Sequence, residues 1–573
     1  MKKNPFSFSS VIIIFSTLVI IRLIYIDFSN RSFQWDSLGY YMYLPSQYIY
    51  HDVKELKWYP ELKEKYNFPG DFYQASKHKE TGNYVFFYTM GVSVLETPFF
   101  FIGHFVAGFL GYSQDGFSPP YHLTINFGLL LYLLVGFFLL RKVLLRWFSD
   151  KITAIVLLLV CLATNFPQYS AIEAGFTHGY LFFIYCLMLY FTVIWHDNPT
   201  LKKSFVIGLI IGFAILIRVT DALIMFIPIF WNCHTKELRK QKIAFFKSQP
   251  KHIYIAILAT FLMLLPQLIY WNHVTGHLIH QMGSKWHFLN PFFRVLVGWE
   301  KGWFIYTPVV LFMVLGLFFM KTKEFRNSVL VFIILNIWVV ISWHVWRYGA
   351  SYSTRALAQC LPVLAFPLGV LITKIYKKKV LIILFSITVS YLTIVNLFQI
   401  WQYNKGIIHY DDMNRRYYQA VYLNPSPTPV EMSLLDTDEF LNNENDFKQE
   451  IIFKSDSVFI LNAEYDTINI LFSEKISEHN LLNAKWLKLS VNYKTDYTVW
   501  GAYFVAELKN SSGLIKQRSI RLDNVLFKSN LKNTAEFYFN TENANSDDEL
   551  IIYGKTIMNS KIELTDFKII SYF

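Results

Sequence analysis

Long runs of apolar residues fill the first 400 positions of the chain, and short polar segments separate them. A helix that crosses a membrane needs roughly 20 mostly apolar residues, and twelve segments approach that length. They are residues 9–27, 84–110, 121–140, 152–170, 179–195, 203–218, 219–232, 252–271, 303–320, 328–345, 356–374 and 380–400. The pattern predicts a mostly α-helical, polytopic transmembrane bundle.

Basic residues predict the orientation of the bundle, because Lys and Arg are enriched in cytoplasmic loops. The first apolar segment follows Met1-Lys2-Lys3 and lacks a small-residue cleavage site, so we expect a retained first helix and a cytoplasmic N-terminus. The basic clusters that we expect to face inward are 141–146, 202–203, 236–251, 321–326 and 374–379. The loop 28–83 and everything after about residue 402 are then extracytoplasmic.

Whether the number of crossings is odd or even follows from the predicted sides of the N-terminus and of the chain after about residue 402. A cytoplasmic start and an outer end require an odd number, whereas the apolar segments number twelve. Segment 84–110 contains Gly91, Pro98 and Gly103, a composition that favours a broken or re-entrant element lining a cavity. We therefore predict 11 or 13 crossings of a plasma (inner) membrane by the domain 1–402.

The pattern changes from long apolar runs to alternation after about residue 425. Asn-Pro-Ser-Pro-Thr-Pro at 424–429 is typical of a linker, which we place at 403–430. Short alternating or strand-like runs follow at 487–493, 502–508, 535–539 and 550–553. They predict an extracytoplasmic β-sandwich of about eight strands over 431–573. Its aromatic residues could stack on sugars or belong to the core: Trp486, Tyr493, Trp500, Tyr503 and Tyr538.

Composition supports this division and excludes several other functions. Hydrophobic residues make up 54% of the chain and charged residues 16%, which does not fit a set of water-soluble cores. The predicted sandwich carries 22 acids and 15 Lys plus Arg, a net charge of about −7, so the rest of the chain carries about +19, which gives the overall +12. This excess of Lys and Arg is explained by the basic cytoplasmic loops that orient the membrane helices, so nucleic acid is not an expected partner. Walker-type loops, dinucleotide fingerprints and Cys-rich metal sites are missing from the sequence.

One acid stands out just after the first apolar segment. Asp36 lies in Phe33-Gln34-Trp35-Asp36-Ser37-Leu38-Gly39-Tyr40-Tyr41, among aromatic residues at a membrane boundary. Ionisable groups near the hydrocarbon are costly and are usually functional or paired. A carboxylate here could act as a general base on a hydroxyl acceptor, or it could be an ordinary loop acid or helix cap. Trp35, Tyr40 and Tyr41 are its candidate substrate-binding neighbours.

Two further pairs of polar residues lie on the predicted outer side. Glu173 and His178 are five positions apart, a spacing that allows contact at a helix start but is not typical of metal ligands. Arg218 lies between two short apolar segments, where it could clamp a phosphate. Asp221 could orient Arg218, or the two residues could form a simple ion pair at i,i+3.

The last candidates lie between residues 285 and 355. The segment 343–355 is dense in aromatic residues and carries Arg347 and Arg355, a combination suited to sugar stacking and phosphate binding. Arg355 precedes an apolar segment with two prolines, and it is the more informative arginine. Lys301 could add a further cation, although snorkelling at the interface would explain it as well.

These motifs, in this order, resemble the GT-C superfamily of integral membrane glycosyltransferases, which includes protein O-mannosyltransferases, aminoarabinose transferases and oligosaccharyltransferase catalytic subunits. The resemblance covers roughly residues 9–400. The motifs that carry it are Trp35-Asp36, Gly91 to His104, Thr177-His178, Ile217-Arg218-x-Thr220-Asp221, Gly302 to Pro308, and Gly349-x-Ser351-Tyr352-Ser353-x-Arg355.

The resemblance implies a polyprenyl-phosphate-linked sugar donor, used on the outer face with inversion at the anomeric carbon. Asp36 would be the general base, and Arg218 and Arg355 would hold the departing lipid phosphate. The acceptor would be a glycan, a lipid or a protein. Leu38 stands where some members carry a second acid, so no Asp-x-Asp metal site is expected, although a divalent metal stays possible.

Two other function classes stay open from the sequence. A lipid-linked glycan polymerase, ligase or flippase would share the helices and the cationic outer loops without depending on one acid. A secondary transporter should show paired repeats and broken helices at mid-membrane, and the sequence shows no repeat.

Overall fold

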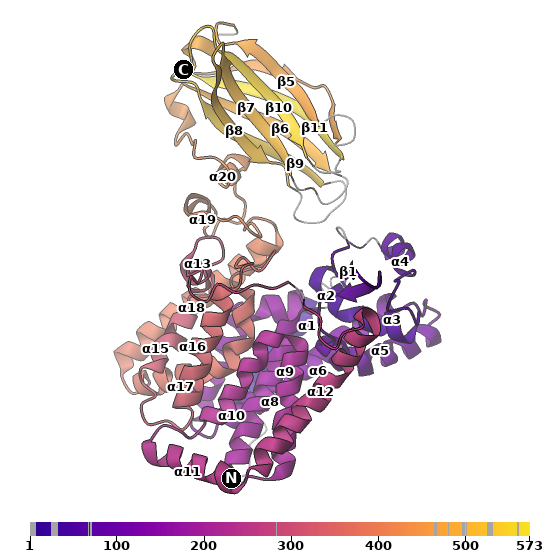
Figure 1. Ribbon diagram of the computed structural model, residues 1–573. Coiled ribbons are helices and arrows are strands. Elements are labelled where there is room, and N and C mark those ends of the chain that lie inside the picture. The colour runs from indigo at the N-terminus through magenta and orange to yellow at the C-terminus, as the bar shows by residue number, and fades with distance from the viewer. Residues whose placement is uncertain are drawn as a thin grey trace. The chain divides into compact units, whose positions relative to one another are not determined.

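The computed structural model describes residues 7–24, 33–66, 68, 72–281, 283–462, 467–478, 481–495, 499, 501–523, 531–557 and 561–573. It divides the chain into two compact units, Met1–Ile400 and Trp401–Phe573 (Figure 1). Parts of the first predicted helix and of the loop 28–83, together with Trp500, lie outside the described residues.

The first unit is almost entirely helical. Its elements are α1 (Phe8–Arg22), α2 (Trp35–Tyr41), α3 (Tyr43–Tyr48), α4 (Tyr59–Tyr66), β1 (Ala75–Lys77), β2 (Tyr84–Phe86), α5 (Gly91–Phe109), α6 (Pro119–Leu144), α7 (Asp150–Leu162), the π-turn η3 (Gln168–Ile172), α8 (Thr177–Asp197), α9 (Leu201–Ile217), the 3-10 helix η4 (Val219–Met225), α10 (Phe226–Phe230), α11 (Lys236–Ser248), α12 (Lys251–Thr275), α13 (Arg294–Val297), α14 (Trp303–Tyr306), α15 (Val310–Leu317), α16 (Arg326–Ser342), the 3-10 helix η5 (Arg355–Cys360), α17 (Leu361–Ile375) and α18 (Lys379–Asn404).

Six helices in the described part of the chain are long and apolar enough to cross a membrane, which makes this an integral membrane protein. They are Gly91–Phe109, Pro119–Leu144, Thr177–Asp197, Lys251–Thr275, Arg355–Ile375 and Lys379–Asn404. Three shorter apolar helical segments accompany them: Phe8–Arg22, Val219–Phe230 and Arg326–Ser342. The prediction of 11 or 13 crossings is not decided by these lengths and stays a prediction.

Several of the twelve predicted segments differ from the structure, among them 84–110 and 303–320. The helical part of segment 84–110 is not broken, because the first residues of the segment form β2 and Gly91–Phe109 form the single helix α5. Its glycines serve close packing, since a Cβ on Gly91 would lie 2.5 Å from the backbone of Ile217. Segment 303–320 is divided into α14 and α15 rather than forming one helix.

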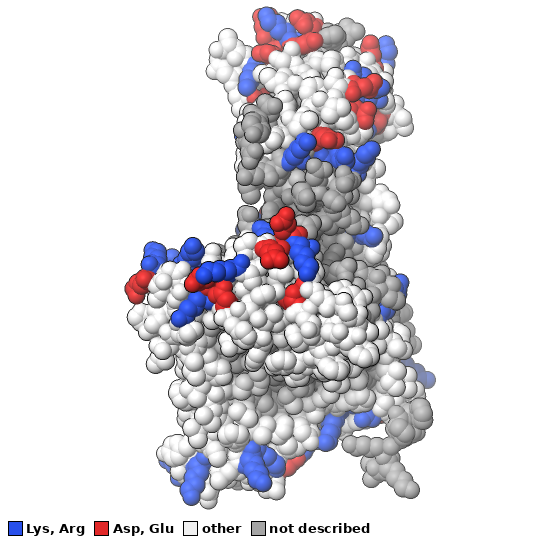
Figure 2. Space-filling model, turned by 90° about the vertical axis from the view of Figure 1, so that its right-hand side faces the viewer, with Lys and Arg blue, Asp and Glu red and all other residues white. Residues whose placement is uncertain are grey.

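Burial distinguishes central helices from peripheral ones. The apolar windows of Thr177–Asp197 and Arg355–Ile375 are 72% and 94% buried inside the protein, whereas those of Lys251–Thr275 and Lys379–Asn404 are only 17% and 22% buried. The first two therefore form the centre of the bundle, and the other two present apolar surface outward. Figure 2 shows a band of this unit without charged side chains, as expected for a surface in contact with lipid.

The segment between α1 and α5 forms a small cap on the bundle. Elements α2, α3, α4 and β1 gather at the end opposite α11, the predicted cytoplasmic basic stretch (Figure 1). Aromatic rings hold the cap together, as in the stacked pair Tyr50 and Trp58, whose ring centroids are 4.9 Å apart. Strands β1 and β2 pair antiparallel within it.

The second unit contains two antiparallel sheets around a common hydrophobic core. Its elements are α19 (Arg415–Val421), α20 (Pro429–Ser433), the 3-10 turns η6 (Glu444–Asp446) and η7 (Leu481–Asn483), β3 (Gln449–Ser455), β4 (Phe459–Asn462), β5 (Ile468–Lys475), β6 (Trp486–Thr495), β7 (Ala502–Asn510), β8 (Gly513–Arg521), β9 (Leu531–Asn540), β10 (Glu549–Thr556) and β11 (Lys561–Tyr572). One sheet has the order β5-β10-β7-β8, and the other has β3-β11-β6-β9 with β4 paired to β11. The four strand-like runs predicted from alternation are confirmed as parts of β6, β7, β9 and β10.

Candidate functional site

Asp36 lies in the first turn of α2, with its side chain 19% exposed. Its Oδ2 is 3.0 Å from Nη2 of Arg355. Its Oδ1 accepts hydrogen bonds from the hydroxyls of Tyr73, at 3.0 Å, and Tyr88, at 2.8 Å. One carboxylate therefore joins the cap to the centre of the bundle, and its charge is stabilised by a guanidinium and two hydroxyl donors.

The backbone around Asp36 is held in an unusual conformation. Trp35 has φ +54°, in the left-handed region that a bulky residue rarely adopts. The carbonyl of Trp35 accepts a hydrogen bond from Nε2 of Gln74 at 3.1 Å, and the Ser37 side chain bonds back to Gln34 at the helix start. Such strain persists only where surrounding contacts enforce it, and it is commonest at functional sites.

Gly39 lets Tyr88 reach the carboxylate. A Cβ at Gly39 would lie 2.3 Å from Cδ2 and 2.5 Å from Cε2 of the Tyr88 ring. The ring therefore occupies the space that any other side chain would take. The motif 33–41 therefore provides the acid, Asp36, and also the glycine that leaves room for the Tyr88 ring, whose hydroxyl donates to this acid.

Arg355 is the first residue of η5, which leads into the buried helix α17. Its guanidinium lies over the ring of Phe176, 5.4 Å from the centroid, and Glu173 is close enough to interact with it electrostatically. The side chain is 15% exposed. The two central helices thus meet here, because Phe176 directly precedes α8 and Arg355 begins η5, which continues into α17.

Arg218 lies where the helical path breaks, as the pattern predicted. It has extended dihedral angles (φ −151°, ψ 123°) between α9 and η4. Its Nε is 4.0 Å from Oδ2 of Asp221, whose Oδ1 accepts a hydrogen bond from the hydroxyl of Tyr185 at 2.8 Å. The Asp221 side chain is 2% exposed and that of Arg218 is 22% exposed, so the acid is enclosed while part of the arginine side chain stays accessible.

Tyr40 connects the two arginines with Asp36. Burial and the negative charge of Asp36 raise the pKa of the Tyr40 hydroxyl to about 12, while the positive charges of Arg218 and Arg355 lower it. All three charged groups therefore act on one hydroxyl, although they come from three distant parts of the sequence. His178 adjoins the same group, since it interacts electrostatically with both arginines, and its Nδ1 is 3.0 Å from Oε1 of Gln359.

The hydroxyls of Tyr73 and Tyr88 are permanent donors to the site. Burial, together with the neighbouring charge of Asp36, raises the pKa of both phenols well above the ordinary value. Both groups therefore stay protonated through the physiological pH range, and each can donate to the carboxylate.

Three of the candidate residues lie apart from this cluster. Tyr41 is buried, with its ring stacked on Phe33 and its hydroxyl donating to the carbonyl of Gly116. Lys301 is 5% exposed, and its Nζ donates to the carbonyls of Arg347, at 2.8 Å, and Gly349. Arg347 itself lies over the ring of Trp346, 5.2 Å from its centroid. Lys301 thus supports the loop that leads to Arg355.

Residues that sequence reasoning missed complete the site. Tyr73, Tyr88 and Gln359 contact Asp36 or His178, and none belongs to a motif singled out beforehand. Tyr88 could have been noticed as a polar aromatic residue three positions before α5. For Tyr73 no sequence signal exists, because the fold of the cap alone brings it to Asp36.

Within the described ranges, no group of three or more His, Cys, Asp or Glu residues is placed to hold a metal ion. The residue at the position of a second Asp-x-Asp acid, Leu38, is buried in the cap.

Comparison with known proteins yields only distant likenesses. No family model matches the chain, and no curated protein matches it. Among solved structures, the oligosaccharyltransferase AglB from Archaeoglobus fulgidus, in complex with an inhibitory peptide and a dolichol-phosphate, aligns at 11% identity with TM-score 0.40, over 72% of this chain and 57% of its own. The Archaeoglobus fulgidus oligosaccharyltransferase in complex with Zn and sulfate aligns at 13% identity with TM-score 0.40, over 72% and 56%.

The arabinosyltransferase EmbB from Mycobacterium smegmatis aligns at 10% identity with TM-score 0.33, over 98% of this chain and 64% of its own. The chain spans less than two thirds of the length of each of these proteins.

Proposed function

We propose that this chain is an integral membrane glycosyltransferase with a GT-C-like bundle. It moves a sugar from a polyprenyl-phosphate donor to a hydroxyl acceptor, a glycan, lipid or protein, at the outer face of the membrane. The observation that carries the proposal is the contact of Asp36 with Arg355, with Arg218 acting on the same neighbourhood through Tyr40. A base and a pair of cations at one membrane boundary are the groups that such a transfer requires.

The reaction assigns each group a separate task. The acceptor hydroxyl loses its proton to Asp36 as its oxygen forms a bond to the anomeric carbon. The bond between that carbon and the phosphate oxygen breaks on the opposite side, so the configuration inverts. The phosphodiester, with one negative charge, departs as a phosphomonoester with up to two. Arg218 and Arg355 oppose this growing charge, and preorganised cations of this kind lower the barrier.

In the structure, Arg355 is paired with the carboxylate that must accept the proton. A donor phosphate competes for the same guanidinium, because planar guanidinium groups bind phosphate oxygens well. Arg355 then turns from Asp36 to the phosphate, and the carboxylate keeps only the hydroxyls of Tyr73 and Tyr88. Donor binding thus frees the base at the moment when it is needed.

The surrounding organisation belongs to the same proposal. The domain 1–402 crosses the plasma (inner) membrane 11 or 13 times, with the N-terminus cytoplasmic, and 431–573 is an extracytoplasmic β-sandwich after a linker at 403–430. Trp35, Tyr40, Glu173 and His178 line the donor and acceptor positions around Asp36. Asp221 positions Arg218 through the contact at 4.0 Å.

The donor class is tested with the purified full-length protein in liposomes. A panel of polyprenyl-phosphate hexoses and pentoses, labelled in the sugar, is incubated with membrane glycan extracts as acceptors. We expect one donor to release its polyprenyl phosphate as labelled product forms with inverted configuration, and nucleotide sugars to be inert. Consumption of a nucleotide sugar, or consumption of no donor in the panel, would overturn the proposal.

A further inference from the structure

A cleft lies inside the second unit, and all of its lining residues belong to that unit. Its volume is about 830 Å³, within the range of about 300–1,000 Å³ typical of small-molecule sites. One wall consists of side chains from strands β6, β9 and β11, and the other of the segment 405–436. Both walls belong to the same compact unit.

The strand wall is a row of polar side chains that fix one another. Oγ1 of Thr534 donates to Oδ1 of Asn492 at 2.7 Å, and Nδ2 of Asn492 donates to Oδ2 of Asp566 at 2.9 Å. The row crosses three neighbouring strands, since Asn492 pairs with Thr534 and with Thr565 in the two ladders. These bonds use one hydrogen and one lone pair of the amide, and its second hydrogen and lone pair can still bond a ligand.

A β-bulge aims Asp566 into this row. The register between β11 and β6 shifts between Thr565 and Lys568, and Asp566 has φ +52°, in the left-handed region. Thr565 and Asp566, the two residues at the register shift, both line the cleft. Bulges that re-aim a side chain are enriched beside functional sites.

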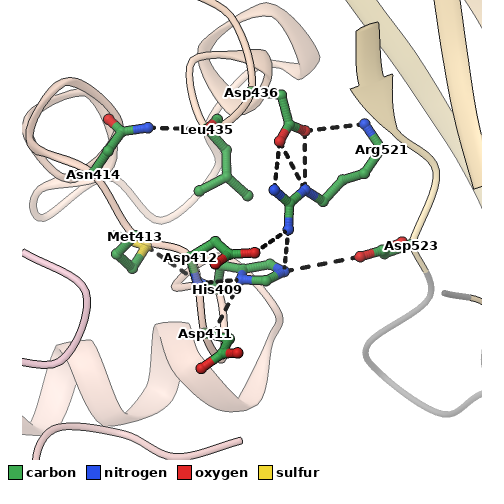
Figure 3. A network of polar contacts seen from close by, with 9 residues as sticks. All are labelled: His409, Asp411, Asp412, Met413, Asn414, Leu435, Asp436, Arg521 and Asp523. Atoms are coloured by element: carbon green, nitrogen blue, oxygen red, sulfur yellow. Dashed lines mark hydrogen bonds and ion pairs between the residues drawn. The ribbon is translucent and has the colours of Figure 1, made fainter. Parts of the chain in front are cut away.

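The opposite wall is firmly attached to the strands. Arg521, at the end of β8, makes a bidentate contact with Asp436 and donates from Nη1 to Oδ2 of Asp412 at 3.0 Å (Figure 3). Nδ1 of His409 accepts from the backbone N–H of Asp412 at 2.9 Å and fixes the same turn. The cleft is therefore preformed, and a ligand does not have to order it.

The ionisable groups of the cleft cancel in charge. Its Lys and Arg residues are Lys405, Lys494, Arg521 and Lys532. Its acids are Asp436, Asp523, Glu563 and Asp566. Four charges of each sign favour neither a polyanion nor a cation as ligand. The segment 425–429 adds three prolines, whose rings give apolar faces beside the polar row.

We propose that this cleft binds a neutral oligosaccharide. Fixed amide, hydroxyl and carboxylate groups match the many hydroxyls of a sugar, and the apolar ring faces match its C–H surfaces. Such binding is a separate activity from the transfer proposed for Asp36, and it can be measured when transfer is absent.

Binding is measured with the full-length protein in detergent micelles by saturation-transfer NMR and by titration. The probes are neutral hexose and pentose oligomers of two to six units and uronic acid oligomers of the same lengths. We expect at least one neutral oligomer to bind and the uronic acid oligomers to bind more weakly. Asn492→Ala should weaken binding at least tenfold, while Asp36→Asn should leave it unchanged.

Ser490→Ala is the matched control, because Ser490 lies two residues along β6, outside the cleft, and bonds Glu536 instead. If Asn492→Ala disturbs the fold, Thr534→Val is the alternative, since Thr534 is exposed and isosteric with valine. The proposal is wrong if no neutral oligomer binds, if uronic acids bind better, or if the cleft variants and Ser490→Ala have equal effects.

Discussion

Oδ2 of Asp36 lies 3.0 Å from Nη2 of Arg355, which joins the cap to the start of the most buried helical segment. The two side chains are 19% and 15% exposed, so the pair is shielded from bulk water without being sealed off. Breaking a pair of this kind from one side leaves a charge without its partner. Each half of the pair is therefore expected to depend on the other for its geometry.

Arg355→Gln is expected to reduce sugar transfer by about 100- to 1,000-fold, since one preorganised group opposing the leaving charge is lost. Arg355→Lys should recover only part of the rate, because an ammonium group lacks the planar fork of guanidinium. The measurement is kcat/KM with a saturable lipid donor. Arg294→Gln, at a surface arginine that is 55% exposed, serves as the control. Equal rates for Arg355→Gln and wild type would contradict the role of the arginine.

Gly39→Ala is expected to lower activity about tenfold or more, because the new Cβ would overlap the Tyr88 ring at 2.3 Å and displace a donor to Asp36. In a Tyr88→Ala background the same change should have little additional effect, and a double-mutant cycle measures this coupling. Gly136→Ala is the matched control, since its nearest neighbour would be 3.4 Å away. Additive effects of Gly39→Ala and Tyr88→Ala would argue against the packing explanation.

Lys301→Met should loosen the loop that leads to Arg355 by about 1–3 kcal/mol, because two carbonyls lose a charged donor in a buried setting. Hydrogen exchange of residues 343–355 in the intact protein measures this change. Lys285→Met, in a more exposed part of the neighbouring loop, is the comparison. If exchange in 343–355 is the same in Lys301→Met and wild type, Lys301 does not support the loop.

The second unit should lose stability in acid through Glu444. Burial raises the pKa of this carboxyl, but hydrogen bonds from Tyr538 and Lys488 outweigh burial, so the pKa lies below the ordinary value. A carboxyl with a depressed folded pKa stabilises the fold above its unfolded pKa, near 4.5, and this stabilisation is lost as the pH falls through the folded pKa.

At pH 7, Glu444→Gln should therefore speed hydrogen exchange of β6 and β9. The expected factor is only about threefold, because the ion pair of Glu444 and Lys488 is partly exposed to solvent. The difference between variant and wild type, compared at the same pH, should shrink as the pH falls through the lowered pKa of Glu444. A difference that stays unchanged as the pH is lowered until the second unit unfolds would show that charge is not the cause.

Local sequence patterns were sufficient to predict the helix break at Arg218, four strands of the second unit and the acid Asp36. The interruption at Arg218 was visible because a charged residue ended one apolar run and began another. Alternation located β6, β7, β9 and β10, since one face of each strand packs into a core. Asp36 was noticeable because an acid at a membrane boundary is costly.

Other features depend on contacts that local patterns do not encode. Tyr40 and Tyr41 both looked like site residues, but successive helical residues point about 100° apart, so only Tyr40 lies beside Asp36. The glycines of 84–110 looked like helix breaks and instead allow close packing against α9 and α6. Lys301 looked like an exposed cation, and its burial becomes evident only when the loop 343–355 folds over it.

The central claim is that Asp36 takes the proton of the acceptor, and the most direct test is the rate of sugar transfer by Asp36→Asn in liposomes with the identified donor. Glu55→Gln is the control, because Glu55 lies on the same cap, is 60% exposed and undergoes the same acid-to-amide change. Donor binding and the melting temperature are recorded for both variants. The account predicts at least a 1,000-fold loss of transfer for Asp36→Asn, with donor binding retained and Glu55→Gln close to wild type. Transfer by a folded, donor-binding Asp36→Asn protein at a rate within a few fold of wild type would contradict it.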